Sequence, residues 1–231
     1  MFPIMILAGG KATRLYPLTL DIPKSMLEFN GKLFIEYQLE LLKNSGFTHV
    51  CLCLGELAEP IIDFVNKNTF GMNITITIDK NPLGTGGAIK RAIRIMGYSN
   101  FFVIYGDSFL NMKYKDMQKI FLGSEKISMM GVYKNDNQFD KSNVKIIDNN
   151  TLLYKKSNTS KDYNFIDSGV SIFNKKVFDG FVEDAFPLSY VQEKLSRKND
   201  ISPYIIKDRF YEVGSLKGIK DFQKYLNRKN E

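Results

Sequence analysis

The stretch IMILAGGKATRL, residues 4–15, joins a continuous apolar run to a loop that holds two glycines, two cations and a hydroxyl group. Such an apolar run is typical of a strand that is covered on both faces of a sheet. Glycine permits close backbone approach, and Lys11 and Arg14 add positive charge, so the loop suits a polyanion such as a phosphate chain. An ordinary turn with exposed charges is the alternative interpretation of this loop taken alone.

Two common phosphate-binding loops do not fit this stretch. A Walker A loop needs a glycine where the chain has Met5, and the Rossmann pattern GxGxxG needs one where it has Lys11. We therefore expect an anion-binding loop of another kind.

Composition favours a single cytoplasmic domain. The chain has 231 residues, of which 44% are hydrophobic, enough for one domain with a full core. No apolar segment approaches the ~20 residues of a membrane span, and the first residues lack the basic region of a signal peptide. We therefore expect one domain over residues 1–231 and no membrane partner.

The net charge of +7 comes mostly from lysines that are scattered over the whole length, with a cluster near residues 217–229. A solvated surface explains this distribution as well as a binding patch does, so no nucleic-acid partner is expected. The net positive charge favours small anionic substrates instead. The sequence alone does not indicate an oligomeric state.

The two cysteines and the single histidine exclude several kinds of site. Cys51 and Cys53 stand two apart in an expected strand, with α-carbons near the upper distance limit for a disulfide, so we expect reduced core thiols. His49 begins that strand at the end opposite the expected ligand crevice, so no Ser-His-Asp or Cys-His set can be built. There are also too few soft ligands for a common structural zinc site, whereas a magnesium site of carboxylates remains open.

Three apolar runs, at 4–8, 50–54 and 101–105, are expected strands, and helical patterns lie between them. The apolar positions at helical spacing are Leu33, Phe34, Tyr37, Leu41 and Leu42, then Ile61, Ile62 and Val65, then Ala88, Ile89, Ala92, Ile93 and Met96. This alternation predicts an α/β fold, with a mixed, mostly parallel sheet flanked by helices on both sides.

Shorter elements complete the expected fold. Residues 73–79 alternate strictly and predict a half-buried strand with Ile74, Ile76 and Ile78 on one face. After Asp107 we expect further strands that extend the sheet and roof the site, at 126–133, 143–147, 151–155 and 165–173. A last helix is expected to begin after the N-cap Ser215 and to bury Leu216, Ile219, Phe222 and Leu226.

Three segments are expected to meet at one edge, because ligands bind outside the carboxyl ends of strands in open α/β sheets. They are the loop at 9–14, the glycine-rich segment NPLGTGGA at 81–88, and YGDS at 105–108. The glycine-rich segment opens a helix, so we expect its free backbone N–H groups to approach a base or a phosphate. A tight turn that merely needs glycine is the alternative.

Two charged residues near this edge suit phosphoryl transfer. Asp107 could hold a metal ion, although a lone aspartate at a strand end is often a cap. Lys24 follows Pro23 in DIPKSM and is presented from a stiff backbone, or is a solvated surface lysine. An ionised phosphate needs no general base to attack another phosphorus, so chemistry without histidine is feasible.

The motifs in combination resemble the sugar-1-phosphate nucleotidyltransferase family. LAGGKATRLYPLT followed by DIPKSM resembles its signature, LAGGxGTRLxPLT followed by PKP, and PLGTGGAI, YGDS, IDSGVSIF and YEVGS match further motifs in order. The most similar branch is that of the short mannose- or heptose-1-phosphate guanylyltransferases. The resemblance implies a Rossmann-like nucleotide-diphospho-sugar transferase fold, with residues 1–110 binding nucleotide and residues 111–231 binding sugar phosphate.

The resemblance also implies an activity and a set of site residues. It implies transfer of a nucleoside monophosphate, best guess from GTP, to a heptose or mannose 1-phosphate for surface polysaccharide precursors, with Mg²⁺ as cofactor. The implied residues are Leu7, Ala8, Gly9 and Gly10 at the nucleoside, Thr13 and Arg14 at the triphosphate, Lys24 at the reacting phosphate, Asn81 or its neighbours and Gly84 at the base, Asp107 and Glu212 at the metal, and Lys156, Asp167 and Gly169 at the sugar phosphate.

Some positions depart from the family pattern, and two other functions remain open. Ala12 replaces a glycine, Ser25 replaces the second proline of PKP, Glu212 replaces an aspartate, and Lys155 stands where a glutamate usually precedes the pocket lysine. The alternatives are a cytidylyltransferase for a non-sugar phosphate such as phosphocholine, and a non-catalytic regulatory subunit. The base depends on how residues 79–85 fold.

Overall fold

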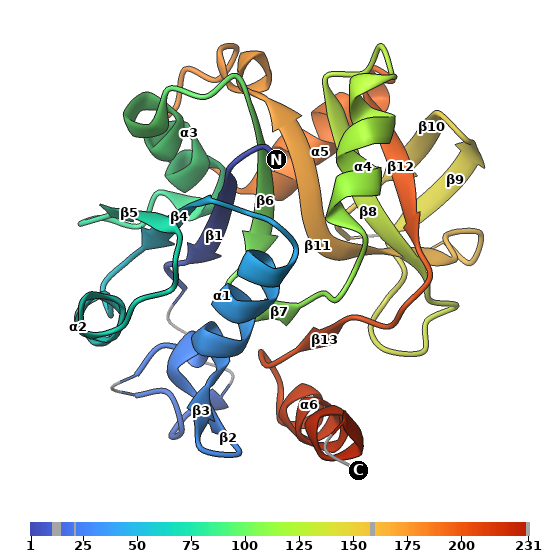
Figure 1. The fold of residues 1–231 in the computed structure, drawn as a ribbon. Helices are drawn as coiled ribbons and strands as arrows, with labels where there is room; N and C mark the ends of the chain where they lie inside the picture. The colour runs from blue at the N-terminus through green and yellow to red at the C-terminus, as the bar shows by residue number, and fades with distance from the viewer. Residues whose placement is uncertain (11–14, 21, 158–159, 230–231) are drawn as a thin grey trace.

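The computed structural model describes residues 1–10, 15–20, 22–157 and 160–229. A nine-stranded sheet runs in the order β10-β9-β11-β6-β1-β4-β5, with β8 beside β11 and β12 beside β8 (Figure 1). Its strands are β1 (Ile4–Ala8), β4 (His49–Leu54), β5 (Asn73–Ile78), β6 (Asn100–Tyr105), β8 (Ser128–Lys134), β9 (Val144–Asp148), β10 (Thr151–Tyr154), β11 (Phe165–Asn174) and β12 (Ile201–Ile206). The mixed sheet predicted from the sequence is confirmed.

Helices cover both faces of the sheet. The helices are α1 (Phe34–Asn44), α2 (Glu59–Lys67), α3 (Gly84–Met96), α4 (Tyr114–Leu122), α5 (Leu188–Arg197) and α6 (Leu216–Lys229), with short 3-10 turns η2 (Lys24–Met26) and η3 (Lys175–Phe178). One hydrophobic cluster lies between the sheet and α3 and α5, and a second lies between the sheet and α1, α2 and α4. The predicted flanking of the sheet on both sides is therefore confirmed.

The nucleotide-binding half expected from the sequence is a wholly parallel part of the sheet. β1 pairs in parallel with β4 and β6, and β4 pairs in parallel with β5. Leu7 lies opposite both Cys53 and Tyr105. The carboxyl ends of these four strands therefore meet at a single edge.

The strands after residue 110 extend the same sheet, as predicted. β11 pairs antiparallel with β6 and with β8, and β9 joins β11 through a single pair, Phe165 with Val144. β10 pairs antiparallel with β9, while β12 pairs in parallel with β8. The sequence patterns did not predict α4, α5 or β12.

The C-terminal segment returns to the parallel half. β13 (Tyr211–Glu212) pairs with β7 (Ser108–Phe109), which follows β6, and a separate hairpin joins β2 (Glu28–Phe29) to β3 (Lys32–Leu33). A third cluster packs around Phe222, whose ring lies 5.0 Å from Phe29 and 5.1 Å from Phe34, measured between centroids. This packing holds α6 below α1 (Figure 1).

Three details of the predicted burial were wrong. Leu33 belongs to β3, and α1 buries two faces, with Ile35 against the sheet and Phe34 against α6, because the returning C-terminus covers a second side of the helix. Leu216 is 60% exposed at the first turn of α6. On β5 the most buried side chain is Thr77, since this edge strand also packs toward α3.

The cysteines are reduced core thiols, as expected. Cys51 and Cys53 are free, buried thiols on β4. The hydrogen bond with the neighbouring Cys51 thiol, together with burial, raises the pKa of Cys53, so that thiol stays protonated. In the described part of the chain, no helix is both long enough and apolar enough to cross a membrane.

Candidate active site

A cavity of about 440 Å³ opens at the carboxyl edge of the parallel strands. Every strand of the parallel half contributes to it through the residues that follow the strand. The lining includes Leu7 and Ala8 at the end of β1 with Gly9 and Gly10 after it, Gly55 and Glu56 after β4, Asp79 and Lys80 after β5, and Tyr105 at the end of β6 with Gly106 and Asp107 after it. The predicted convergence of segments at this edge is confirmed for the described residues.

Lys24 and Asp107 form an ion pair in the cavity wall. The Lys24 Nζ atom donates to Asp107 Oδ2 at 2.7 Å, and the two side chains are 19% and 27% exposed. Lys24 comes from η2, and Asp107 comes from the turn between β6 and β7. Two residues that lie far apart in the sequence therefore meet in one wall of the cavity.

Glu212 joins this pair because β13 lies against β7. Glu212 is the register partner of Ser108, and the Val213 N–H donates to the Asp107 carbonyl oxygen at 2.8 Å. A Cβ atom added to Gly214 would lie 2.9 Å from Asp107 Oδ2, 2.9 Å from Glu212 Oε2 and 3.3 Å from Lys24 Nζ. Both carboxylates and the ammonium therefore surround one point, which only a residue without a side chain leaves open.

The donor set at this point suits Mg²⁺. Mg²⁺ usually binds one or two carboxylates and completes its shell with water and substrate phosphates. Asp107 and Glu212 supply two carboxylates, and no group of three or more His, Cys, Asp or Glu side chains with metal-binding geometry occurs among the described residues. Glu212 also accepts from the Gly214 N–H and the Ser215 hydroxyl, both at 2.5 Å, so these donors orient its carboxylate.

Asp79 is a cavity residue that the sequence analysis did not single out. It directly follows β5, its side chain is 11% exposed, and Arg91 Nη1 lies 3.4 Å from its Oδ1. Burial raises the pKa of Asp79, and the charge of Arg91 partly offsets this shift. The carboxyl-edge rule that selected the other segments would have found it.

The glycine-rich start of α3 is already occupied by protein, which corrects the prediction of free N–H groups. The N–H groups of Gly86 and Gly87 both donate to the Phe186 carbonyl oxygen, at 2.9 and 3.2 Å. A Cβ on Gly86 would lie 2.4 Å from the Phe186 ring. These two glycines therefore make room for the segment before α5, while Gly84 and Thr85 do line the cavity.

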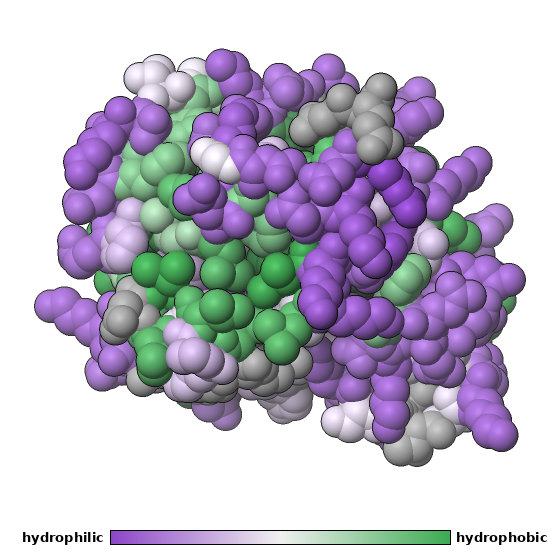
Figure 2. All heavy atoms as spheres, turned by 90° about the horizontal axis from the view of Figure 1, so that it is seen from below, coloured by the Kyte–Doolittle hydropathy of each residue, from purple (hydrophilic) through white to green (hydrophobic). Residues whose placement is uncertain are grey.

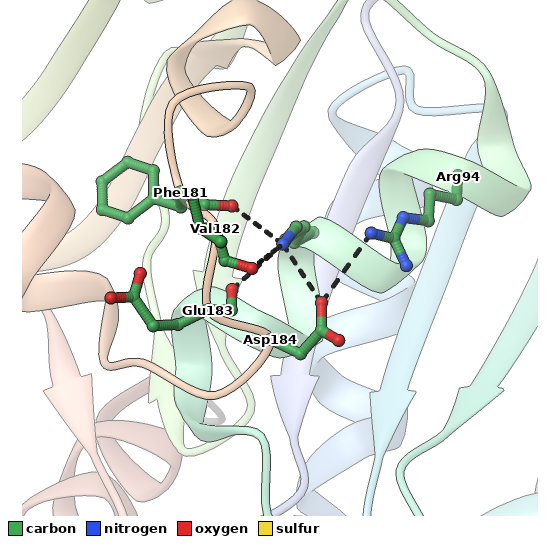
Figure 3. Close-up of polar contacts among 6 residues, drawn as sticks. Arg94, Phe181, Val182, Glu183 and Asp184 are labelled. Atoms are coloured by element: carbon green, nitrogen blue, oxygen red, sulfur yellow. Dashed lines mark hydrogen bonds and ion pairs between the residues drawn. The ribbon is translucent and has the colours of Figure 1, made fainter.

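Lys90 on α3 fastens the same segment. Its ammonium donates to the carbonyl oxygens of Phe181 at 2.9 Å, Val182 at 3.4 Å and Glu183 at 3.0 Å, and to Asp184 Oδ1 at 3.1 Å (Figure 3). Its side chain is 15% exposed. The segment 181–184 is thus fixed to the helix whose first turn lines the cavity; we call it the strap.

The predicted sugar-pocket residues lie beside the Asp107 turn. A Cβ on Gly169 would lie 3.0 Å from Tyr105 and 3.0 Å from the Ser108 hydroxyl. Asp167 accepts from the Gly169 N–H at 2.9 Å and from Gln192 Nε2 at 3.2 Å. Burial raises the pKa of Asp167, and the hydrogen bonds from Gly169 and Gln192, with a smaller contribution from the charge of Lys156, partly offset the shift.

Among the predicted residues that the structure describes, those absent from the cavity lining are Asn81, Lys156, Asp167, Gly169 and Glu212. Thr13 and Arg14 lie outside the described residues, as do Lys11 and Ala12. Asn81 is exposed and is absent from the cavity lining, although its neighbours Lys80 and Pro82 belong to it. Asn81 is therefore a weaker candidate for base contact than Asp79.

Apolar side chains are exposed at several of the described residues between β1 and η2. Tyr16, Leu18, Leu20 and Ile22 are 47%, 52%, 53% and 36% exposed, and the segment runs directly into Pro23 and Lys24, which line the cavity. Figure 2 shows hydrophobic side chains gathered on the lower face of the molecule, within a largely hydrophilic surface.

The fold and the cavity define an α/β protein with a cavity at the carboxyl edge of a parallel sheet, where ligands bind in such folds. The family model for nucleotidyl transferases matches residues 4–214. The chain therefore belongs to the nucleotidyl transferase family.

Two relatives and one solved structure show which nucleotidyl transferases this chain is similar to. The chain is 30% identical over 212 residues to the D-glycero-alpha-D-manno-heptose 1-phosphate guanylyltransferase of Campylobacter jejuni, covering 91% of this chain and 93% of the relative. The enzyme of that name from Aneurinibacillus thermoaerophilus is 29% identical over 201 residues, 82% of this chain and 86% of the relative. The crystal structure of HddC from Yersinia pseudotuberculosis complexed with GMP-PN superposes with a TM-score of 0.80 at 28% identity, covering 98% and 100% of the two chains.

Proposed function

We propose that the chain transfers GMP from GTP to a heptose or mannose 1-phosphate, which yields a GDP-sugar and pyrophosphate. The observation that carries this proposal is the convergence of Lys24, Asp107 and Glu212 at Gly214, beside a cavity that could hold a nucleotide. The names of the full-length relatives favour GTP and a manno-configured heptose phosphate as substrates. They do not favour the cytidylyltransferase or the non-catalytic alternative.

The reaction needs charge neutralisation and alignment rather than a proton shuttle. A phosphate oxygen of the sugar 1-phosphate attacks the α-phosphorus of GTP, the bond to the β-phosphate bridging oxygen breaks, and pyrophosphate leaves with that electron pair. Asp107 and Glu212 would hold Mg²⁺, which would neutralise phosphate charge. Lys24 would move its ammonium from Asp107 to the phosphate under attack, since both are anionic partners of the same cation.

We assign the nucleotide to residues 1–110 and the acceptor to residues 111–231. Leu7 to Gly10 would contact the nucleoside, Gly84 would lie near the base, and Thr13 and Arg14 would hold the triphosphate. Asp167, Gly169 and Lys156 would bind the sugar phosphate; the support for this is that Gly169 lies against Tyr105 and Ser108, at the two ends of the Asp107 turn, and that Asp167 accepts from the Gly169 N–H.

Asp79 is our candidate for reading guanine. The Watson–Crick edge of guanine presents two neighbouring donors, the N1–H and the N2 amino group, and one carboxylate can accept from both. Cytosine presents only one donor on that edge. Asp79→Asn should therefore lower kcat/KM for GTP by roughly 10–100-fold, the loss expected for one or two hydrogen bonds to a charged group.

Pyrophosphate release tests the proposed function. Purified protein with Mg²⁺ is given ATP, CTP, GTP, UTP or dTTP in turn, each with heptose 1-phosphate, mannose 1-phosphate, glucose 1-phosphate or phosphocholine. We expect release with GTP and a manno-configured phosphate. Release only with CTP and phosphocholine, or with no pair at all, would overturn the proposal.

A further inference from the structure

A buried glutamine on α1 braces the turn that carries Asp107. The turn runs from Tyr105, the last residue of β6, through Gly106 and Asp107 to Ser108, the first residue of β7. Gln38 is 2% exposed and lies on the face of α1 that packs against the sheet. Figure 1 shows α1 beside β7.

One side-chain amide spans the whole turn. Gln38 Nε2 donates to the Tyr105 carbonyl oxygen at 3.0 Å and to the Ser108 carbonyl oxygen at 2.5 Å. The two acceptors lie immediately before and after Gly106 and Asp107. Since an NH₂ group has two hydrogens, both are used, and the two ends of the turn are joined to one rigid group.

Backbone hydrogen bonds attach the turn to two other elements. The Gly106 N–H donates to the Leu7 carbonyl oxygen at 2.9 Å, and the Val213 N–H donates to the Asp107 carbonyl oxygen at 2.8 Å. These bonds tie the turn to β1 and to the β13 side. Gln38 is the contact from α1, so the turn is fixed to three elements.

A buried glutamine at this position is energetically unfavourable in itself. Its neighbours on the same helix face are Ile35, Leu39 and Leu42, all buried hydrophobic residues. Its own Oε1 atom is buried and accepts no hydrogen bond from the residues that the structure describes. A buried carbonyl oxygen without a partner is destabilising, so the two donated bonds must matter more than the lost one.

Resting on the proposed function, we propose that Gln38 is a positioning residue that fixes the Asp107 carboxylate for the metal ion. It touches neither substrate nor metal and acts through the backbone of the turn. Residues that orient a metal ligand from behind typically change metal affinity or activity by ~10–100-fold when they are removed. Through Asp107, Gln38 would therefore affect the binding of a divalent cation that is bound together with a triphosphate.

Gln38→Met tests this assignment because methionine has a similar length and helix propensity but no donor. Leu39→Val, one residue further along the same helix and fully buried, is the matched control, since it weakens the core without touching the turn. For each protein we would measure kcat, the KM for GTP, the Mg²⁺ concentration at half-maximal rate, and amide hydrogen exchange of the peptide that spans Tyr105–Ser108.

For Gln38→Met we expect faster exchange in the turn, a kcat lowered by roughly 10-fold or more, and a raised Mg²⁺ requirement, with the KM for GTP changed by less than about 2-fold. Leu39→Val should lower the melting temperature while leaving these four readouts near wild type. Unchanged exchange and Mg²⁺ dependence in Gln38→Met, or equal effects of both variants, would overturn the assignment.

The exchange readout separates this proposal from the proposed function. If the wild type releases no pyrophosphate with any substrate pair, the proposed function fails. In that case faster exchange of the turn in Gln38→Met alone would still support its bracing role, and unchanged exchange would overturn it.

Discussion

Replacing Lys90 by methionine would release the strap from α3 while keeping the aliphatic part of the side chain. The ammonium has three protons, and its two shortest bonds to the strap carbonyls, to Phe181 and Glu183, are 2.9 and 3.0 Å long. The methionine would leave both carbonyl oxygens without this donor. Because the strap leads to Phe186, whose carbonyl oxygen accepts from the Gly86 and Gly87 N–H groups in the first turn of α3, the change would reach the cavity wall.

The size of the effect follows from these two bonds. A protein hydrogen bond contributes roughly 1 kcal/mol net, so the two bonds together amount to about 2 kcal/mol of unfolding free energy. The ion pair with Asp184 adds little, because that carboxylate side chain is 72% exposed. For a chain of this size, about 2 kcal/mol corresponds to a melting temperature lowered by roughly 4–8 °C.

Arg94→Met is the matched control for this prediction. Arg94 contacts the same Asp184 carboxylate at 3.8 Å but reaches none of the three strap carbonyls shown in Figure 3. We would measure thermal and urea unfolding and the KM for GTP for both variants. Lys90→Met should lose stability and bind GTP more weakly, whereas Arg94→Met should resemble the wild type. Equal unfolding curves for the two variants would refute the reasoning.

Three further predictions concern the site itself. Asp107→Asn should lower pyrophosphate release by ~100-fold or more, because a charge at the metal is lost, while circular dichroism shows an intact fold; full activity would contradict the metal role. Gly214→Ala should strongly reduce the rate, since its methyl group would meet both carboxylates, whereas Gly123→Ala, with its nearest neighbour at 3.6 Å, should not; equal rates would exclude crowding at the site. Burial raises the pKa of Asp167, so ionising it costs more in the folded chain than in the unfolded one, and unfolding free energy is lost as pH rises above the unfolded pKa. The melting temperature of Asp167→Asn relative to wild type should therefore increase from pH 4 to pH 8 in differential scanning fluorimetry, and the opposite trend would contradict this.

The parallel half of the fold was predictable because its signals are local. Continuous apolar runs marked β1, β4 and β6, and the rule that ligands lie at the carboxyl edge then selected Gly9, Gly10 and Asp107. These inferences need only one strand and its following loop. The strands were confirmed, and Gly9, Gly10 and Asp107 line the cavity at that edge, whereas the roles predicted for them stay predictions.

The missed features depend on partners that are distant in the sequence. Glycines at 86 and 87 indicate close approach, but the sequence does not say that the approaching group is Phe186 rather than a ligand. Gln38 is a single polar residue on an apolar helix face. Its hydrogen bonds to the Asp107 turn cannot be predicted until the fold brings that turn beside the helix. Leu216 fits the apolar period of α6, yet it lies at the first turn, beyond the packed aromatic cluster.

Because β13 pairs with β7, the site residues are synthesised at different times, and the site is complete only when β13 has been made. The glycine loop, Lys24 and Asp107 leave the ribosome early, and the parallel strands that support them can then begin to assemble. Glu212 and the aromatic side chains of α6 emerge much later, and only then does the second carboxylate reach its neighbour across the turn. A nascent chain would thus carry the nucleotide cavity before it could complete the reaction centre.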